Sequence, residues 1–124
     1  MQLSELSQTL ISGESADPYE ARLRNLADAL GLQKLLIHEE SLAAGKSGSR
    51  AHCHSQKEEL IFVLEGNVDV ILGAQTSTLG PGEFVGFKPG SQEFHQIRNS
   101  GSIEARYLSI ASVSQNDDVI YRSR

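Results

Sequence analysis

Cysteine is almost absent from this chain of 124 residues, in which Cys53 is the only one. A single cysteine cannot form an intramolecular disulfide, so nothing in the sequence points to an oxidising compartment. The N-terminus lacks a basic segment followed by an apolar run, which is the pattern of a secretory signal. No stretch approaches the ~20 apolar residues that span a bilayer. These absences predict a cytoplasmic protein with no membrane partner.

Positive charge is also scarce, since 11 Lys and Arg residues stand against 16 Asp and Glu residues and the formal net charge is -5. Without a basic stripe, nucleic acid is not an expected partner. Arg122 and Arg124 make the end of the chain locally basic, but two charges are more typical of a solvated terminus. The length fits one domain with one core, so a site must lie in that core or at a subunit interface.

Familiar catalytic motifs are missing too. The sequence has no Ser-His-Asp arrangement and no phosphate-binding glycine loop, and the Gly-Pro-Gly at 80–82 is typical of a hairpin turn. It has no internal repeat and no low-complexity segment. What remains to explain function is the placement of a few histidines and carboxylates.

The first part of the chain carries helix signals. Leu3, Leu6, Leu10 and Ile11 are spaced for a short helix within residues 1–16, but the pattern lapses, and a frayed arm is the alternative. Residues 17–31 are clearer, because an Asp-Pro pair begins them, four apolar residues share one helical face and a glycine ends them. We expect one short helix there, covering an opening or an edge of the rest.

From residue 32 the apolar period changes to that of strands. We expect about eight short strands at the ~8–12-residue spacing of an antiparallel sandwich or barrel. Such a small barrel encloses roughly one small ligand. The expected strands are residues 35–42, 50–54, 60–64, 68–72, 75–79, 84–87, 93–98 and 103–112, with a possible edge strand at 119–121.

Two histidines lie one residue apart, at His52 and His54. Side chains alternate along a strand, so both imidazoles point the same way and lie roughly 6.5–7 Å apart at the Cα atoms, while Cys53 points away and packs in the core. Glu59 stands at an odd offset from His54, but a turn at 55–57 brings it in from the adjacent antiparallel strand. Both imidazoles and this carboxylate can then reach one ion.

His95 is the remaining candidate ligand, and we expect it to arrive from the far side of the barrel. Glu58 points the other way and is the weaker carboxylate. Three imidazoles and one carboxylate form an N3O set that suits several divalent metals, namely Zn²⁺, Fe²⁺, Mn²⁺ or Ni²⁺, without choosing among them. An open coordination position would let the metal act as a Lewis acid or activate water or dioxygen.

Other polar residues are weaker candidates for contact with a metal or a substrate. His38 stands beside two glutamates and is expected to face solvent or the rim of the pocket. A structural role is expected for Tyr107 on the last long strand. Gln92, Glu93 and Gln96 are possible substrate contacts, and the sequence does not decide among them.

These residues resemble the two motifs of the cupin superfamily. In the first motif, His-x-His is followed by a glutamate and then a glycine. In the second, a proline and a glycine precede a histidine and an asparagine. The matching positions are His52, His54, Glu59, Gly66, Pro89, Gly90, His95 and Asn99. The resemblance covers roughly residues 32–113 and is closest to small single-domain cupins. Lys46 stands where the first motif begins with glycine, and Pro89 and Gly90 lack the usual intervening residue.

The resemblance implies an all-β double-stranded β-helix, or jelly-roll barrel, to which the residues above add a short N-terminal helix. It implies an N-terminal arm at 1–31, a cupin barrel at 32–113 and a C-terminal tail at 114–124. It also implies a homodimer, and one divalent ion on His52, His54, Glu59 and His95. The function would be that of a small-molecule oxygenase or isomerase, or of a non-catalytic protein that binds a sugar or organic acid.

Overall fold

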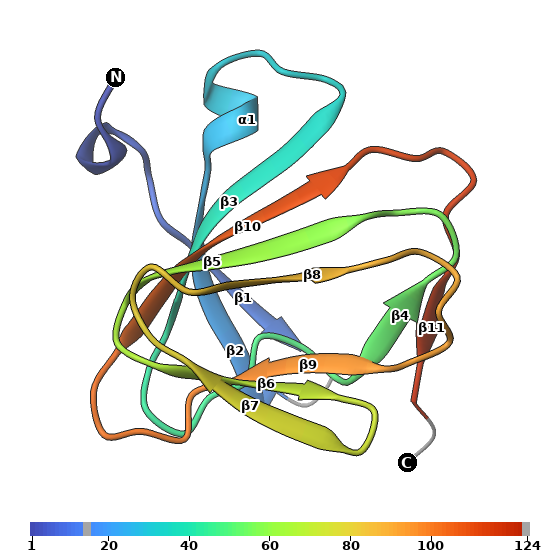
Figure 1. Ribbon diagram of the computed structural model, residues 1–124. Helices are drawn as coiled ribbons and strands as arrows, with labels where there is room; N and C mark the ends of the chain where they lie inside the picture. The colour runs from blue at the N-terminus through green and yellow to red at the C-terminus, as the bar shows by residue number, and fades with distance from the viewer. Residues whose placement is uncertain (14–15, 123–124) are drawn as a thin grey trace.

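The computed structural model describes residues 1–13 and 16–122, and two antiparallel sheets dominate it (Figure 1). One sheet has the strand order β1-β2-β3-β10-β5-β8 and the other has the order β11-β4-β9-β6-β7. The first comprises β1 Thr9–Gly13, β2 Ala16–Asn25, β3 Leu35–Leu42, β5 Glu59–Glu65, β8 Phe84–Phe87 and β10 Ala105–Ser112. The second comprises β4 His52–His54, β6 Val68–Leu72, β7 Gln75–Leu79, β9 His95–Arg98 and β11 Val119–Tyr121. The predicted β-rich class is confirmed, including the final edge strand.

The helix predicted over residues 17–31 is wrong for most of its length. Strand β2 occupies Ala16–Asn25 and pairs with β1 on one side and β3 on the other. Only Leu26–Ala29 is helical (α1), and the Asn25 side chain caps this single turn by accepting the Asp28 N–H at 2.9 Å. The two ladders of backbone hydrogen bonds stabilise this segment as a strand more than its local sequence stabilises a helix, because a short helix is only marginally stable by itself.

The residues before and after strand β2 also differ in part from the expected helices. Gly31, the glycine that ends residues 17–31, takes a left-handed conformation, with φ of +69°. Leu3–Glu5 forms a 3-10 turn (η1) ahead of strand β1, so the first residues are neither the short helix nor the frayed arm expected. Residues 14–15, at the end of that stretch, and Arg124, in the basic tail, lie outside the described residues.

Buried apolar side chains from both sheets form one core. Its members are Ala21, Leu42, Ile61, Val63, Val68, Val70, Phe87, Ile97, Ala105 and Tyr107. Burying each of the larger ones contributes about 1.5–3 kcal/mol. Four of them, Ile61, Phe87, Ile97 and Tyr107, also line a cavity, so the core forms part of the walls of an internal site.

Within the described ranges, no helix is long and apolar enough to cross a membrane.

Candidate metal centre

The two sheets together bring His52, His54, Glu59 and His95 into one cluster. One nitrogen or oxygen from each side chain lies within 4.8 Å of the others. His52 and His54 share a face of β4, as their spacing predicts, and Cys53 between them is buried, as predicted. The sequence therefore identified four residues that the fold places together.

The strands that supply the cluster differ from the expectation. Strand β4 pairs with β11 and β9, and His52 lies directly opposite His95 across the β4–β9 ladder. Glu59 begins β5, which belongs to the other sheet. Thus His95 is the neighbour of the His-x-His pair, and Glu59 is the residue that reaches across. The segment after His54 is a crossing between sheets and not a hairpin.

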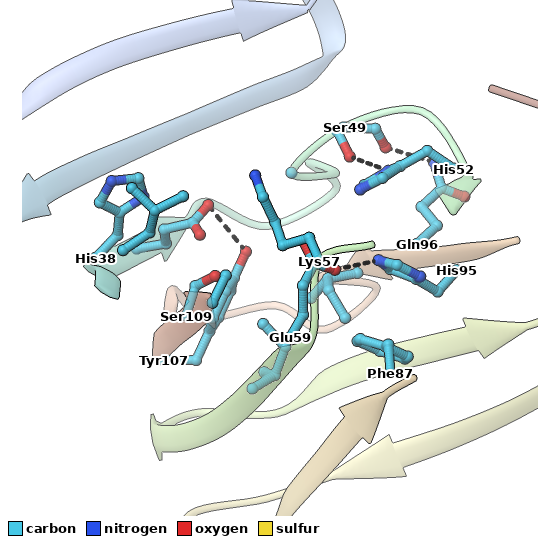
Figure 2. A pocket seen from close by; sticks show the side chains of 16 residues that line it. His38, Ser49, His52, Lys57, Glu59, Phe87, His95, Gln96, Tyr107 and Ser109 are labelled. Atoms are coloured by element: carbon cyan, nitrogen blue, oxygen red, sulfur yellow. Dashed lines mark hydrogen bonds and ion pairs between the residues drawn. The ribbon is translucent and has the colours of Figure 1, made fainter. Parts of the chain in front are cut away.

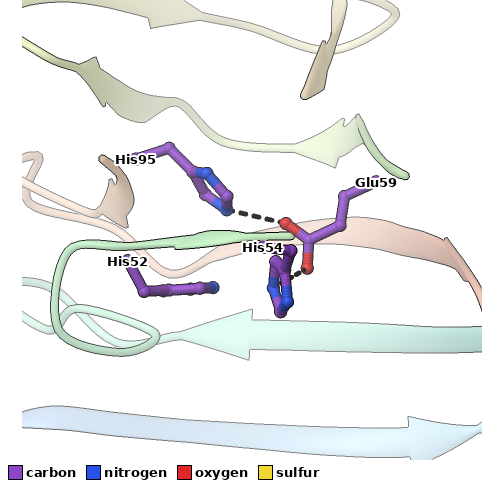
Figure 3. Close-up of side chains that lie close together, drawn as sticks. All are labelled: His52, His54, Glu59 and His95. Atoms are coloured by element: carbon purple, nitrogen blue, oxygen red, sulfur yellow. Dashed lines mark ion pairs between the residues drawn. The ribbon is translucent and has the colours of Figure 1, made fainter. Parts of the chain in front are cut away.

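The Glu59 carboxylate bridges two of the histidines (Figure 3). Its Oε1 atom lies 2.9 Å from His54 Nε2, and its Oε2 atom lies 2.6 Å from His95 Nε2. The His52 ring is close by, with its centroid 4.5 Å from that of His95 and 5.0 Å from that of His54. The four donors therefore converge on one point from two sides.

Hydrogen bonds outside the cluster fix the tautomers of two imidazoles. His52 Nδ1 lies 2.9 Å from the carbonyl oxygen of Arg50, and His54 Nδ1 lies 2.7 Å from Asp117 Oδ2. A carbonyl or a carboxylate can only accept, so each Nδ1 carries the proton and donates it. In the neutral imidazole, each Nε2 is then left with a lone pair that faces the cluster.

The His54 Nε2 atom supplies a test of whether a cation fits. This atom is buried and makes no hydrogen bond, although Glu59 Oε1 is only 2.9 Å away. A lone pair beside a carboxylate oxygen is unfavourable when nothing positive lies between them. A divalent ion would satisfy both atoms, and neutral imidazoles with a carboxylate are the ligand forms that it needs. The residues present therefore fit a metal.

The charge state of the cluster agrees with that fit. Burial lowers the pKa of His52, and the neighbouring imidazoles of His95 and His54 add to the effect. Burial alone would raise the pKa of Glu59, but its hydrogen bond with His95 and the nearby imidazoles hold it below its usual range. The site thus favours a neutral imidazole and an anionic carboxylate.

Phe87 also stacks on His95, with ring centroids 3.9 Å apart and an interplanar angle of 4°, which fixes that ring.

Asp117 is a supporting residue that the sequence analysis missed. Besides accepting from His54, its carboxylate accepts the N–H groups of Gln56 at 2.9 Å and Lys57 at 3.0 Å. Burial by itself would raise the pKa of Asp117, but these hydrogen bonds lower it to about 2. An aspartate in a polar stretch is an ordinary surface pattern, so the only signal was its place just before a final strand.

A cavity of about 230 Å³ adjoins the cluster (Figure 2). His52, Glu59 and His95 line one end of it, whereas His38 and Tyr107 line the other. Lys57, Ser49 and Gln96 also reach its walls. Of the three possible substrate contacts, Gln96 is therefore the one that lines this cavity. Gln92 and Glu93 are exposed and do not line it.

Two glutamates of β3 are not the surface residues that the sequence suggested. Glu39 is completely buried and is held by Arg24 at 3.2 Å and Arg106 at 2.9 Å. Glu40 faces the other way, into the cavity, where burial raises its pKa to about 7. His38 shares the face of Glu40 and also lines the cavity. The signal was present in the alternation along this strand, which ends in the buried Leu42.

The fold and the site together define a β-sandwich protein with a three-histidine, one-carboxylate centre beside a small cavity. The Cupin domain family model matches residues 38–111, more than half of the chain, and the chain therefore belongs to the cupin domain family. No curated protein sequence matches it.

Solved structures resemble the whole chain. A proposed sugar phosphate isomerase from Acidithiobacillus ferrooxidans is 27% identical, with a TM-score of 0.89 over 96% of this chain and 76% of its own. A cupin-superfamily sugar phosphate isomerase from Silicibacter pomeroyi is 21% identical, with a TM-score of 0.89 over 100% and 82%. The polyketide cyclase RemF from Streptomyces resistomycificus is 22% identical, with a TM-score of 0.83 over 100% and 84%. The last two likenesses, at lower identity, bear on the fold alone.

Proposed function

We propose that this cupin is a metal-dependent enzyme whose substrate is a small polar molecule held in the cavity. One divalent ion would be held by His52, His54, Glu59 and His95. The observation that carries the proposal is the buried His54 Nε2 atom, which has a lone pair, no hydrogen bond and a carboxylate oxygen 2.9 Å away. When bound, the ion supplies Lewis-acid polarisation of a substrate oxygen. The N3O donor set suits Zn²⁺, Fe²⁺, Mn²⁺ or Ni²⁺.

Isomerisation is the reaction class that we favour over oxygenation. The proposed sugar phosphate isomerase noted above is 27% identical over nearly the whole chain. An isomerisation is complete within one substrate, whereas an oxygenation also needs dioxygen. A hydroxycarbonyl compound offers adjacent oxygens to the cluster and polar groups to the remaining walls, so it suits a cavity of about 230 Å³.

Lys57 provides a place for a negative charge on such a substrate. Its side chain projects into the cavity between the cluster and the far end (Figure 2). Burial lowers the pKa of His38, and the charge of Lys57 lowers it further, so that charge acts inside the cavity. We propose that Lys57 pairs with a carboxylate or phosphate group. The Lys57→Met variant should then raise KM more than it lowers kcat.

The assembly expected from the sequence also belongs to this proposal. We propose that the two sheets close as a jelly-roll barrel and that two copies associate as a homodimer in the cytoplasm. Among the described residues, strand β1 is the edge strand of its sheet, and it exposes Leu10 and Ile11 at 48% and 44%, which supports pairing with a second copy. Light scattering of the purified protein gives the mass in solution, and a monomer would contradict the dimer.

Metal analysis of the purified protein tests the site itself. The wild-type protein should carry one divalent ion per chain, and His54→Ala and His95→Ala should each lose most of it. His38→Ala is the matched control, because this histidine lines the same cavity outside the cluster and should leave the metal content unchanged. Full occupancy in both cluster variants would refute the assignment. Saturable binding of a sugar or acid without any product would instead favour the non-catalytic binding protein.

A further inference from the structure

Glu40 is an ionisable side chain in the cavity that the metal centre does not use. It projects from β3 into the cavity, where its Oε1 atom lies 3.4 Å from the Tyr107 hydroxyl. Among the described residues, Glu40 forms no ion pair, in contrast to its neighbour Glu39 with two arginines. An enclosed carboxyl group that forms no ion pair is a costly arrangement, so its presence calls for an explanation.

The surroundings of Glu40 leave it able to exist in both protonation states near neutral pH. Burial raises its pKa, hydrogen bonds with Ser109 and Tyr107 lower it, and the charge of Glu59 raises it, with about 7 as the result. The Tyr107 hydroxyl lies 3.4 Å from Glu40 Oε1 and is itself buried, with a pKa raised well above its usual value. Tyr107 therefore stays protonated and donates. The other titratable groups around the cavity are His38 on β3, His52 on β4, Lys57 before β5, Glu59 on β5 and His95 on β9.

We propose that Glu40 is the catalytic residue that moves a proton between adjacent carbon atoms of a hydroxycarbonyl substrate. This inference rests on the metal-dependent function proposed above. The substrate would place its carbonyl and hydroxyl oxygens toward the His/Glu cluster and its C–H bond toward Glu40. Both groups line the same cavity, so one small molecule can reach both.

The proposed step is balanced within the substrate and Glu40. The Glu40 carboxylate removes the proton from the hydroxyl-bearing carbon, so that C–H bond breaks and an O–H bond forms on Glu40. The released electron pair forms a carbon–carbon double bond and the carbonyl π pair moves onto the carbonyl oxygen, which gives an enediolate. Glu40 then returns the proton to the former carbonyl carbon, and the hydroxyl proton moves between the two oxygens. The product is the isomeric hydroxycarbonyl compound, and no oxidant or reductant is consumed.

Deuterium exchange tests this role directly. The metal-loaded, full-length protein is incubated in D₂O with glyceraldehyde, dihydroxyacetone, ribulose and fructose, each free and as its phosphate, and carbon-bound deuterium is followed by NMR. The wild-type protein should exchange the carbon-bound proton of at least one probe. Glu40→Gln keeps the shape of the side chain and one acceptor oxygen but cannot remove a proton, so exchange should fall by about 100-fold or more.

Two controls separate this inference from the proposed function. Glu104→Gln removes an exposed carboxylate and should exchange like the wild type. Metal content and probe binding should be equal in the wild type and Glu40→Gln. Exchange by Glu40→Gln within a few-fold of the wild type would overturn the role of Glu40, and so would a wild-type protein that binds metal and probe without exchange. A wild-type protein that binds no metal would overturn the proposed function first, and this inference with it.

Discussion

The Asp117 carboxylate lies 2.7 Å from His54 Nδ1, and this contact joins the segment before the last strand to the metal centre. Strand β11, which follows Asp117, pairs with β4 and places Val119 opposite His54 and Tyr121 opposite His52. This segment lies beyond residues 38–111, which the cupin family model matches. The orientation of two histidines on β4 therefore depends on residues outside the matched region.

Asp117→Ala should weaken metal binding about 10- to 100-fold, because the carboxylate holds His54 in the tautomer that presents Nε2. Competition with a chromogenic chelator gives the Kd of each variant. Asp118→Asn is the control, since Asp118 is exposed and it is its backbone N–H that bonds to Ser55. Equal affinities in the wild type and Asp117→Ala would show that the contact does not support the site.

The structure explains why glycine stands at position 66, in the first cupin motif, and unfolding measurements can test the explanation. Its φ is +70°, and a Cβ atom there would lie 2.7 Å from the carbonyl oxygen of Glu104. Gly82 also has a positive φ, +84°, but nothing lies within 4 Å of the corresponding Cβ position. Gly66→Ala should therefore cost about 1–3 kcal/mol for the strained backbone plus a steric penalty, whereas Gly82→Ala should cost only the strain. Urea unfolding measures both, and equal losses would contradict the close approach.

The sequence was sufficient for the identity of the cluster because the relevant patterns are local. Alternation along a strand places His52 and His54 on one face, and motif spacing adds Glu59 and His95. Which sheet supplies each ligand depends on pairing between distant strands, and there the expectation failed. It put Glu59 on the strand next to the pair and His95 across the barrel, but the fold has the reverse.

The other failures have a similar cause. The caps at both ends of residues 17–31 favour a helix, and nothing local reveals that β1 and β3 supply hydrogen-bond partners. Glu39 and Glu40 were placed at the surface because charged residues are rarely buried. Their burial depends on Arg106 for Glu39 and on Tyr107 for Glu40, more than 60 positions along the chain in each case.

The ion pairs of Glu39 predict a large effect on stability. The carboxylate is completely buried, whereas the side chains of Arg24 and Arg106 are 23% and 28% exposed. Replacing both arginines by methionine leaves the charge without a partner and should cost about 3–5 kcal/mol of unfolding free energy. Adding Glu39→Gln to that double variant should recover part of the loss, because the buried charge is gone. Chemical denaturation of all three proteins measures this, and no recovery would show that the charge is not the cause.

The pKa of Glu40 predicts how stability varies with pH. Burial raises this pKa from 4.5 to about 7, so the folded protein keeps a proton that the unfolded chain releases in that range. The stabilisation from this proton is fully present below about pH 4.5 and is lost as the pH rises to about 7. Glu40→Gln has no such proton to lose. In metal-free protein with a chelator present, its stability relative to the wild type should therefore rise by up to about 3 kcal/mol across that range. Denaturation at about pH 5 and about pH 8 measures the difference, and a constant offset would mean that Glu40 is charged in the cavity throughout.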